Sequence, residues 1–352
     1  VSGGPGTGKS VLAINLLGEL LKLGLMGAYV SKNMAPRKVY KNSLVYNNEI
    51  SIHELFKSSG YFFRDPENKY DFLLVDEAHR LQEKSGVHYN IGENQIKEII
   101  HASKITAFFV DEAQMVTLKD IGTINNIKYF AKDAQAKILE YELTSQFRCN
   151  GSDSYLDFIE HFLYNKKRTC KFHFDFQVLN SPNELRDLIK LKNTHYNARL
   201  VAGFCWKRDA HHADNQEFMD IKIGDFEASW NLKHGEPFAT RKSAINEVGC
   251  IHNVQGLEFD YIGVIIGPDL KYENRKVVTD YKMRANTEKS LYGLYVLMKQ
   301  DKEFYEKLAD TLIRNTYRVL LTRGIKGCYV YASDAKLNEH LKRIAQNNFI
   351  NS

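Results

Sequence analysis

Cysteine, proline and tryptophan are all scarce in this sequence. Its 352 residues include five cysteines, six prolines and two tryptophans. The cysteines form no C-x-x-C pair and have no H-x-x-x-H partner, which is typical of a reducing compartment and argues against a structural zinc site. No run approaches the roughly 20 apolar residues that a membrane span needs. We therefore expect a cytoplasmic protein with no membrane partner.

A large excess of one charge is also missing. The net charge of +5 is mild, so it permits a polyanionic partner without indicating one. Hydrophobic residues make up 43% of the chain, as in ordinary globular proteins, and the length predicts about two domains. His211, His212 and Asp214 form a weak metal candidate, because adjacent histidines in a polar stretch are usually solvated.

The first ten residues, in contrast, carry a strong pattern. The apolar spacing from residue 11 to residue 21 predicts that a helix follows them at once. Glycines let the backbone N–H groups converge, the helix N-terminus and a lysine add positive charge, and a hydroxyl is placed to bind Mg²⁺. The residues that fit G-x-x-x-x-G-K-[ST] and would hold a nucleoside triphosphate are Gly3, Gly4, Pro5, Gly6, Thr7, Gly8, Lys9 and Ser10. Since the chain begins on this loop, we expect a truncated first strand and further residues upstream.

Apolar runs that read as buried strands alternate with helical patterns along the rest of the chain. Strands are predicted at 27–31, 72–75, 105–110, 138–143, 198–204, 261–266 and 327–331. Helices are predicted at 51–56, 94–102, 121–133, 152–164, from 182 onward after the N-cap Ser181, and at 303–321. This alternation predicts an α/β fold with parallel sheets and a ligand crevice at the C-terminal edge of the strands. We expect an N-terminal domain over 1–150, a connecting segment over 151–180 and a C-terminal domain over 181–352.

Two acidic pairs follow predicted strands. Asp76 and Glu77 are placed as hydrolysis requires, with Asp76 on Mg²⁺ and Glu77 orienting and deprotonating the attacking water. Asp111 and Glu112 stand in the same local sequence, Val-Asp-Glu-Ala, as Asp76 and Glu77. Spacing alone therefore leaves either pair as the metal site.

Two arginines stand at informative places. Arg148 follows the last strand of the first domain, and Arg323 follows a helix of the second. An arginine from a facing domain can stabilise the charge that develops on a γ-phosphate. For either arginine taken alone, a surface ion pair is the more common explanation.

Taken together, these stretches resemble motifs I to VI of superfamily 1 helicases, which are built from two RecA-like domains. They are most similar to the bacterial Schlafen group 3-like DNA/RNA helicase domain, and the resemblance covers about residues 1 to 335. The stretches that carry it are 3–10, 76–77, 108–114, 146–148, 249–270 and 315–324, with the sequences GGPGTGKS, DE, FFVDEAQ, QFR, GCIHNVQGLEFDYIGVIIGPDL and NTYRVLLTRG.

The resemblance implies a role for each motif. Asp76 and Glu77 are the Walker B pair, Asp111 and Gln114 the sensor of motif III, and ATP with Mg²⁺ is bound in the cleft between two RecA-like P-loop domains. The other residues it implies are Arg148 and Arg323 as arginine fingers and Gln255, Gly256 and Glu258 between nucleotide and nucleic acid. Single-stranded DNA or RNA, or a tailed duplex, is the implied partner, with Ser31, Lys32, Trp206 and Lys207 as candidate contacts. Proteins that resemble this family often carry further domains upstream.

These observations favour an ATP-driven motor on nucleic acid, either a helicase or a single-strand translocase. The alternative is a nucleotide-dependent switch or effector ATPase that binds nucleic acid or protein without unwinding. The compact chain leaves little room for a large inserted subdomain with a separating wedge. A small-molecule kinase is disfavoured, because it gives no reason for the motifs around Gln255 and Arg323.

Overall fold

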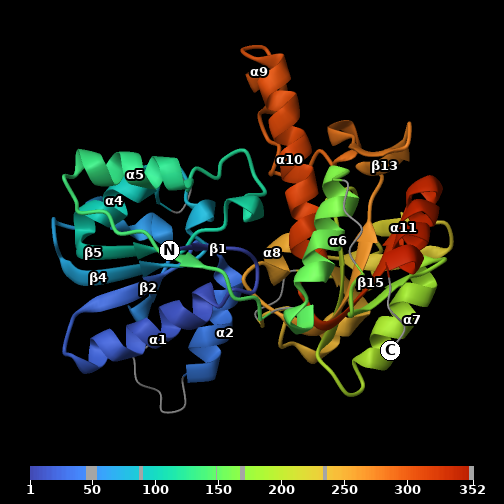
Figure 1. Cartoon of the computed structure of the whole chain (residues 1–352), viewed down its shortest axis with the longest axis horizontal. Helices are drawn as coiled ribbons and strands as arrows, with labels where there is room; N and C mark the ends of the chain where they lie inside the picture. The colour runs from blue at the N-terminus through green and yellow to red at the C-terminus, as the bar shows by residue number, and fades with distance from the viewer. Residues whose placement is uncertain (45–53, 87–89, 148, 167–170, 233–235, 349–352) are drawn as a thin grey trace. The chain divides into compact units, whose positions relative to one another are not determined.

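The computed structural model of the chain describes residues 1–44, 54–86, 90–147, 149–166, 171–232 and 236–348 (Figure 1). The chain divides into two compact units. The first comprises residues 1–115 and 119–146, and the second comprises residues 116–118 and 147–352. Each unit has its own sheet and its own helices, and each is described by itself below.

The first unit is built on parallel strands. Its four-stranded sheet has the order β3-β2-β4-β5, with β3 at Phe56–Lys57, β2 at Gly27–Val30, β4 at Tyr70–Val75 and β5 at Ser103–Phe108. A short parallel pair joins β1 (Ser2–Gly3) to β6 (Glu142–Leu143). A parallel bridge from Ser2 to Val110 sets β1 beside the continuation of β5. The stretch that leads to Asp111 therefore runs between β1 and β4.

Helices cover both faces of this sheet, as Figure 1 shows. They are α1 (Lys9–Lys22) and α2 (Met34–Leu44) on one side and α4 (Gln95–Ala102) and α5 (Ile124–Asp133) on the other. In β4, Phe72 and Leu74 belong to the core cluster that contains α1 residues, whereas Leu73 and Val75 belong to the cluster with α4. Burial on both faces explains why β4 is an unbroken apolar run rather than an alternating one.

The second unit contains a seven-stranded sheet of order β7-β15-β12-β8-β11-β10-β9. All of its pairings are parallel except that between β9 and β10. The bounds are Asp175–Val178 for β7, Ala198–Ala202 for β8, Ile221–Ile223 for β9, Phe226–Trp230 for β10, Glu247–Gly249 for β11, Phe259–Ile266 for β12 and Gly324–Ala332 for β15. A separate hairpin pairs β13 (Leu270–Glu273) with β14 (Lys276–Thr279).

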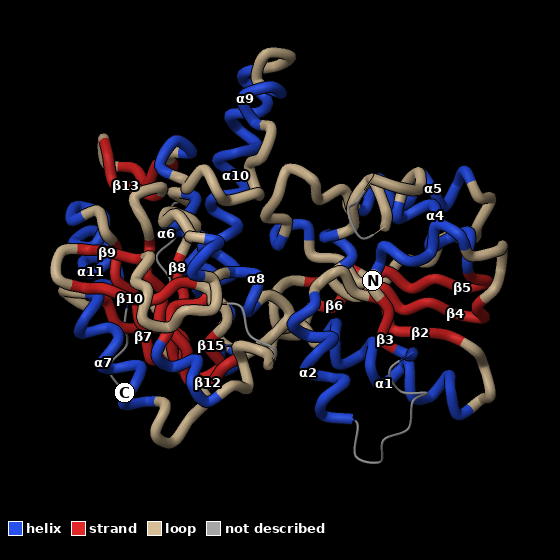
Figure 2. The backbone as a smooth tube through the Cα atoms, turned by 180° about the vertical axis from the view of Figure 1, so that it is seen from behind, coloured by secondary structure: helices blue, strands red, loops and turns tan. Residues whose placement is uncertain are grey.

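The helices of the second unit are α6 (Asp153–Tyr164), α7 (Pro182–Lys192), α8 (Ile251–Val254), α9 (Leu294–Leu297), α10 (Lys302–Leu321) and α11 (Ala335–Asn348). Helix α7 begins as its sequence predicts, since the Ser181 side chain accepts a hydrogen bond from the Glu184 N–H. Figure 2 shows α9 and the first part of α10 projecting away from the sheet. No helix within the described ranges is both long and apolar enough to cross a membrane.

The expected α/β architecture with mostly parallel sheets is confirmed. Two details differ from the sequence prediction. The strand expected over 138–143 is limited to β6, because Leu139 and Tyr141 are exposed and the partner strand β1 has two residues. The segment 151–180, expected to connect two domains, supplies α6 and the sheet strand β7. Part of the helix predicted at 51–56 lies outside the described residues.

A buried ion pair holds the base of the projecting segment. Arg284 Nε lies 2.8 Å from Asp269 Oδ2, and the Tyr317 hydroxyl donates to the other oxygen of the same carboxylate. Asp269 is fully buried in the turn between β12 and β13, and Arg284 also donates to the Ser290 and Thr316 hydroxyls. Two segments that are far apart in sequence are thereby joined inside the second unit.

Asp269→Ala should destabilise the second unit by about 3–5 kcal/mol, because it leaves the buried Arg284 guanidinium with only its longer contact to Glu288, at 3.8 Å, and removes the acceptor of the Tyr317 hydroxyl. Both tryptophans, Trp206 and Trp230, belong to this unit, so urea unfolding followed by tryptophan fluorescence reports on it. Lys271→Ala is the matched control, since it removes the half-exposed pair with Asp280 and should cost less than about 1 kcal/mol. Equal losses for both variants would contradict this account of Asp269.

Candidate nucleotide site

The glycine-rich loop between β1 and α1 has the backbone that phosphate binding needs. Gly8, the N-cap of α1, has φ 85°, in the left-handed region that glycine favours. A Cβ on Gly3 would lie 2.5 Å from Thr7 Oγ1, so the close approach of the loop to its own strand also requires glycine. Thr7 Oγ1 donates to the Gly4 carbonyl over 3.0 Å and closes the turn.

Lys9 lies at the centre of this loop. Its ammonium group donates to the carbonyls of Gly3 and Gly4 at 2.7 and 2.6 Å, and it is 4.0 Å from Asp111 Oδ2. The Gln146 side chain donates to the Pro5 carbonyl over 2.5 Å. Both the Lys9 and the Gln146 side chains thus donate hydrogen bonds to backbone carbonyls of this loop. Arg148, predicted as a catalytic arginine, lies outside the described residues.

Ser10 and Asp76 form a pair of oxygen donors. The Ser10 hydroxyl donates to Asp76 Oδ2 over 2.6 Å, and the Tyr29 hydroxyl donates to the same oxygen over 2.6 Å. Burial raises the pKa of the Asp76 carboxyl, and the neighbouring charge of Glu77 adds to the rise. A hydroxyl and a carboxylate side by side are ligands that suit Mg²⁺, which binds oxygen. These two residues therefore fit the metal that the sequence pattern predicts.

Glu77, His79, Asp111 and Gln114 form a buried chain of contacts beside this pair. Glu77 Oε2 lies 3.0 Å from His79 Nε2, and His79 Nδ1 accepts from the Asp111 N–H over 3.3 Å. That second contact leaves the ring proton on Nε2, where it points at Glu77. Gln114 Nε2 donates to Asp111 Oδ2 over 2.8 Å. Glu77 is thus joined to the Asp111 and Gln114 stretch through one histidine.

Glu112, the glutamate of the second Asp-Glu pair, has different contacts from Glu77. Its side chain is exposed, and Oε1 accepts from the Ile124 N–H over 2.7 Å at the start of α5. Asp111 approaches Lys9, whereas Asp76 contacts Ser10. The two Asp-Glu pairs, equivalent in sequence, therefore have different surroundings. Sequence reasoning assigned no role to His79 or Tyr29, since Tyr29 reads as an ordinary core residue of a strand.

The predicted residues of the second unit also come together. Gln255 is buried at the end of α8, Gly256 follows with φ 81°, and Glu258 is exposed just before β12. Arg323 is fully buried, and its guanidinium donates to the Val319 carbonyl at 2.9 Å and the Leu257 carbonyl at 3.3 Å. Motif V and motif VI of the resemblance thus meet at the starts of the adjacent strands β12 and β15.

The candidate nucleic-acid residues differ in accessibility. Ser31 is fully buried, Lys207 is exposed, and Trp206 is half-buried with its ring centroid 6.3 Å from that of Trp230. Lys32 lies 3.9 Å from Asp120, which Arg80 also contacts. Burial, followed by the charge of Arg80, lowers the pKa of Lys32 to about 7. Its amine therefore gains charge as the pH falls through neutrality.

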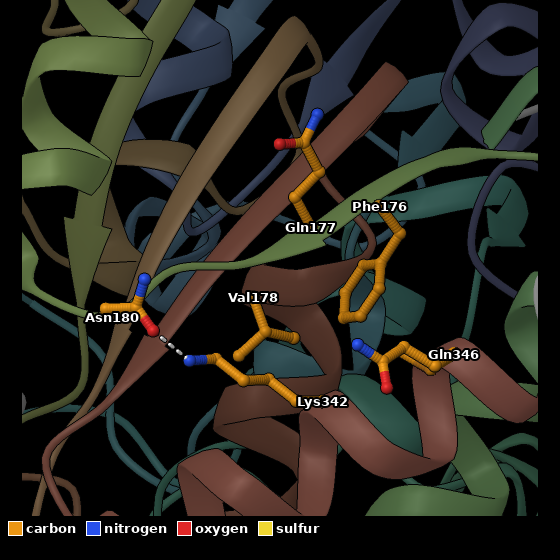
Figure 3. A pocket seen from close by; sticks show the side chains of 7 residues that line it. Phe176, Gln177, Val178, Asn180, Lys342 and Gln346 are labelled. Atoms are coloured by element: carbon orange, nitrogen blue, oxygen red, sulfur yellow. Dashed lines mark hydrogen bonds between the residues drawn. The ribbon is translucent and has the colours of Figure 1, made fainter.

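Within the described residues no cluster of three or more histidine, cysteine or acidic side chains could hold a metal. His212 instead stacks on Phe218 with 4.1 Å between ring centroids. A pocket of about 620 Å³ lies between β7 and α11, and Figure 3 shows Lys342 donating to Asn180 beside it. None of the predicted site residues lines this pocket.

Comparison with known protein families identifies the family to which these motifs belong. The sequence model of the Schlafen group 3 DNA/RNA helicase domain matches residues 1–334, which is nearly the whole chain. The chain belongs to this family. As a Schlafen group 3 helicase domain, it is a helicase-like protein whose glycine-rich loop and acidic residues lie at one sheet edge of the first unit.

Proteins similar to this Schlafen group 3 domain include one curated sequence and two solved structures. The uncharacterized protein YPL245W of Saccharomyces cerevisiae is 26% identical over 385 residues, covering 97% of this chain and 83% of that protein. Bacteroides Pif1 bound to single-stranded DNA is a structural neighbour at 11% identity and a TM-score of 0.34, covering 97% and 89% of the two chains. A structure of two Pif1 helicases at forked DNA has 10% identity and a TM-score of 0.30, covering 75% and 80%.

Proposed function

We propose that this domain is an ATP-hydrolysing motor that acts on single-stranded DNA or RNA, or on a tailed duplex. The observation that carries the proposal is the convergence of Lys9, the Ser10 and Asp76 pair, and the chain from Glu77 to Gln114 at the C-terminal edge of one parallel sheet. Open α/β sheets bind their ligands at that edge. Family membership supports the same activity.

Each residue of the site has a distinct task in this proposal. The loop N–H groups and Lys9 bind the β- and γ-phosphates, and Ser10 and Asp76 hold Mg²⁺, which when bound neutralises charge on the phosphates. Glu77 orients the attacking water and accepts its proton, while His79 fixes the carboxylate. Gln114 senses the γ-phosphate state, and Gln255, Gly256 and Glu258 link the nucleotide to the strand. Arg148 and Arg323 as arginine fingers, ATP as the preferred nucleotide and a cytoplasmic location stay predictions.

The proposal predicts that single-stranded nucleic acid stimulates ATP hydrolysis. The reason is that the same motifs, between Asp111 and Arg323, are proposed both to contact the strand and to act on the nucleotide. A coupling free energy in the usual range corresponds to an increase of roughly 5- to 150-fold in the ATPase rate. The measurement is the steady-state ATPase rate with and without single-stranded DNA and RNA, followed by strand displacement on a tailed duplex. Stimulation with displacement supports a helicase, and stimulation alone supports a translocase or a switch. An unchanged rate with both nucleic acids would remove the motor proposal.

A further inference from the structure

The segment that projects from the second unit exposes large apolar side chains. We call its end, residues 289–299, the arm tip; it includes α9 and lies just before α10 (Figure 1, Figure 2). Tyr292, Tyr295 and Val296 are 70%, 64% and 64% exposed, whereas Leu294 is buried and anchors the turn. Spacings of three and four residues place such side chains on one face of a helical turn. Water therefore contacts two aromatic rings and an aliphatic side chain on one small surface.

Exposed lysines flank these rings in the sequence. Lys289 and Lys299 lie at the two ends of the arm tip and Lys282 lies near its base, and all three are exposed. Within the described part of the chain, none of these three ammonium groups has an ion-pair partner. The lysines farther along α10 are different, since Lys302 pairs with Glu306 and Lys307 with Glu303. The arm tip consequently carries positive charge that its own unit does not neutralise.

We propose that the arm tip binds an unpaired stretch of nucleic acid, with Tyr292 and Tyr295 stacking on bases and Lys289 and Lys299 facing phosphates. Aromatic rings beside cationic groups are the combination that binds single strands without sequence preference. A protein partner fits less well, because lysine is depleted where protein surfaces bury apolar side chains. This inference rests on the proposed function, since it assigns a further contact to the strand on which the motor acts.

Contacts within the second unit hold the arm tip in place, which favours stacking of bases on its rings. The Tyr295 ring meets Tyr281 edge-on, with 6.1 Å between centroids and 67° between planes. At the base, the buried pair of Arg284 and Asp269 joins the segment to the turn between β12 and β13. Rings that are already held in place lose less conformational freedom when a base stacks on them, so more of the stacking energy appears as affinity.

The test measures the affinity of a labelled single-stranded oligonucleotide by fluorescence anisotropy. Tyr292→Ala and Tyr295→Ala should each weaken binding about tenfold, whereas Tyr292→Phe and Tyr295→Phe keep the stacking surface and should stay within about twofold. Lys289→Ala and Lys299→Ala should each reduce the slope of log affinity against log salt by about 0.7. Tyr61→Ala, at a tyrosine of the first unit that is 65% exposed, is the matched control and should bind as the unaltered protein does.

The outcomes separate this inference from the proposed function. If the unaltered protein fails to bind DNA and RNA, the proposed function itself fails. If it binds and the alanine variants at Tyr292 and Tyr295 bind equally well, only the arm-tip assignment is overturned, and the exposed rings are then left as a protein-docking surface. A loss for the alanine variants with retention for the phenylalanine variants supports stacking, provided that thermal unfolding midpoints are unchanged.

Discussion

Glu77→Gln is expected to abolish ATP turnover while ATP binding is retained. Glutamine is close to isosteric with glutamate and can still accept the His79 Nε2–H contact, so the buried chain from Glu77 to Gln114 should persist. It cannot accept a proton from the attacking water, and loss of general base catalysis typically costs roughly 10²- to 10⁴-fold in rate. Steady-state ATPase rates and equilibrium binding of a fluorescent ATP analogue measure the two effects separately.

Glu112→Gln is the matched control, because it makes the same chemical change in the duplicated Asp-Glu text. Glu112 is exposed and accepts from the Ile124 N–H, so its replacement should leave turnover nearly unchanged. The contacts of Ser10 with Asp76 and of Lys9 with Asp111 support this assignment. If Glu112→Gln stops hydrolysis and Glu77→Gln does not, the roles of the two pairs are reversed.

The regular elements of the fold could largely be predicted from local sequence, for a physical reason. Strands such as β4 and β12 are buried on both faces, so they appear as apolar runs that no helix of ordinary amphipathic pattern produces. Helix α7 carries its own cap in Ser181. The strands β9 and β10 and the hairpin of β13 and β14 have no such signal, because short strands at or near a sheet edge, or in a separate hairpin, depend on partners that local sequence does not name.

The residues of the candidate site can be predicted from the sequence, but the contacts that join them cannot. Glycines, a lysine and a serine at fixed spacing indicate a phosphate loop wherever they occur. The contacts of Tyr29 with Asp76 and of His79 with Asp111 join residues of neighbouring strands, so they depend on strand order rather than on spacing. Likewise, the exposed rings of the arm tip look in sequence like ordinary helix core. Only the fold distinguishes an apolar residue that is covered from one that is not.

Arg323→Lys is expected to lower kcat by about 10³- to 10⁵-fold with little change in ATP affinity, if the arginine acts on the γ-phosphate in the transition state. Lysine keeps the charge but lacks the planar fork that can meet two phosphate oxygens at once. Arg323 is also fully buried, with hydrogen bonds to the Val319 and Leu257 carbonyls. A purely structural arginine would instead lower the thermal unfolding midpoint and spare kcat, so both quantities must be measured.

Arg199→Lys supplies the control for that structural role. Arg199 is a buried arginine of β8 whose guanidinium also donates to backbone carbonyls, at 3.1 Å from Phe238 and 2.9 Å from Ala239. Its replacement should reduce stability and leave kcat unchanged, because no motif assigns it to the nucleotide. The two variants are compared at similar thermal unfolding midpoints. If Arg323→Lys then has a much lower kcat and Arg199→Lys keeps the kcat of the unaltered protein, Arg323 is a catalytic arginine. Parallel losses of stability with unchanged kcat would make Arg323 a structural residue and remove it from the ATP site.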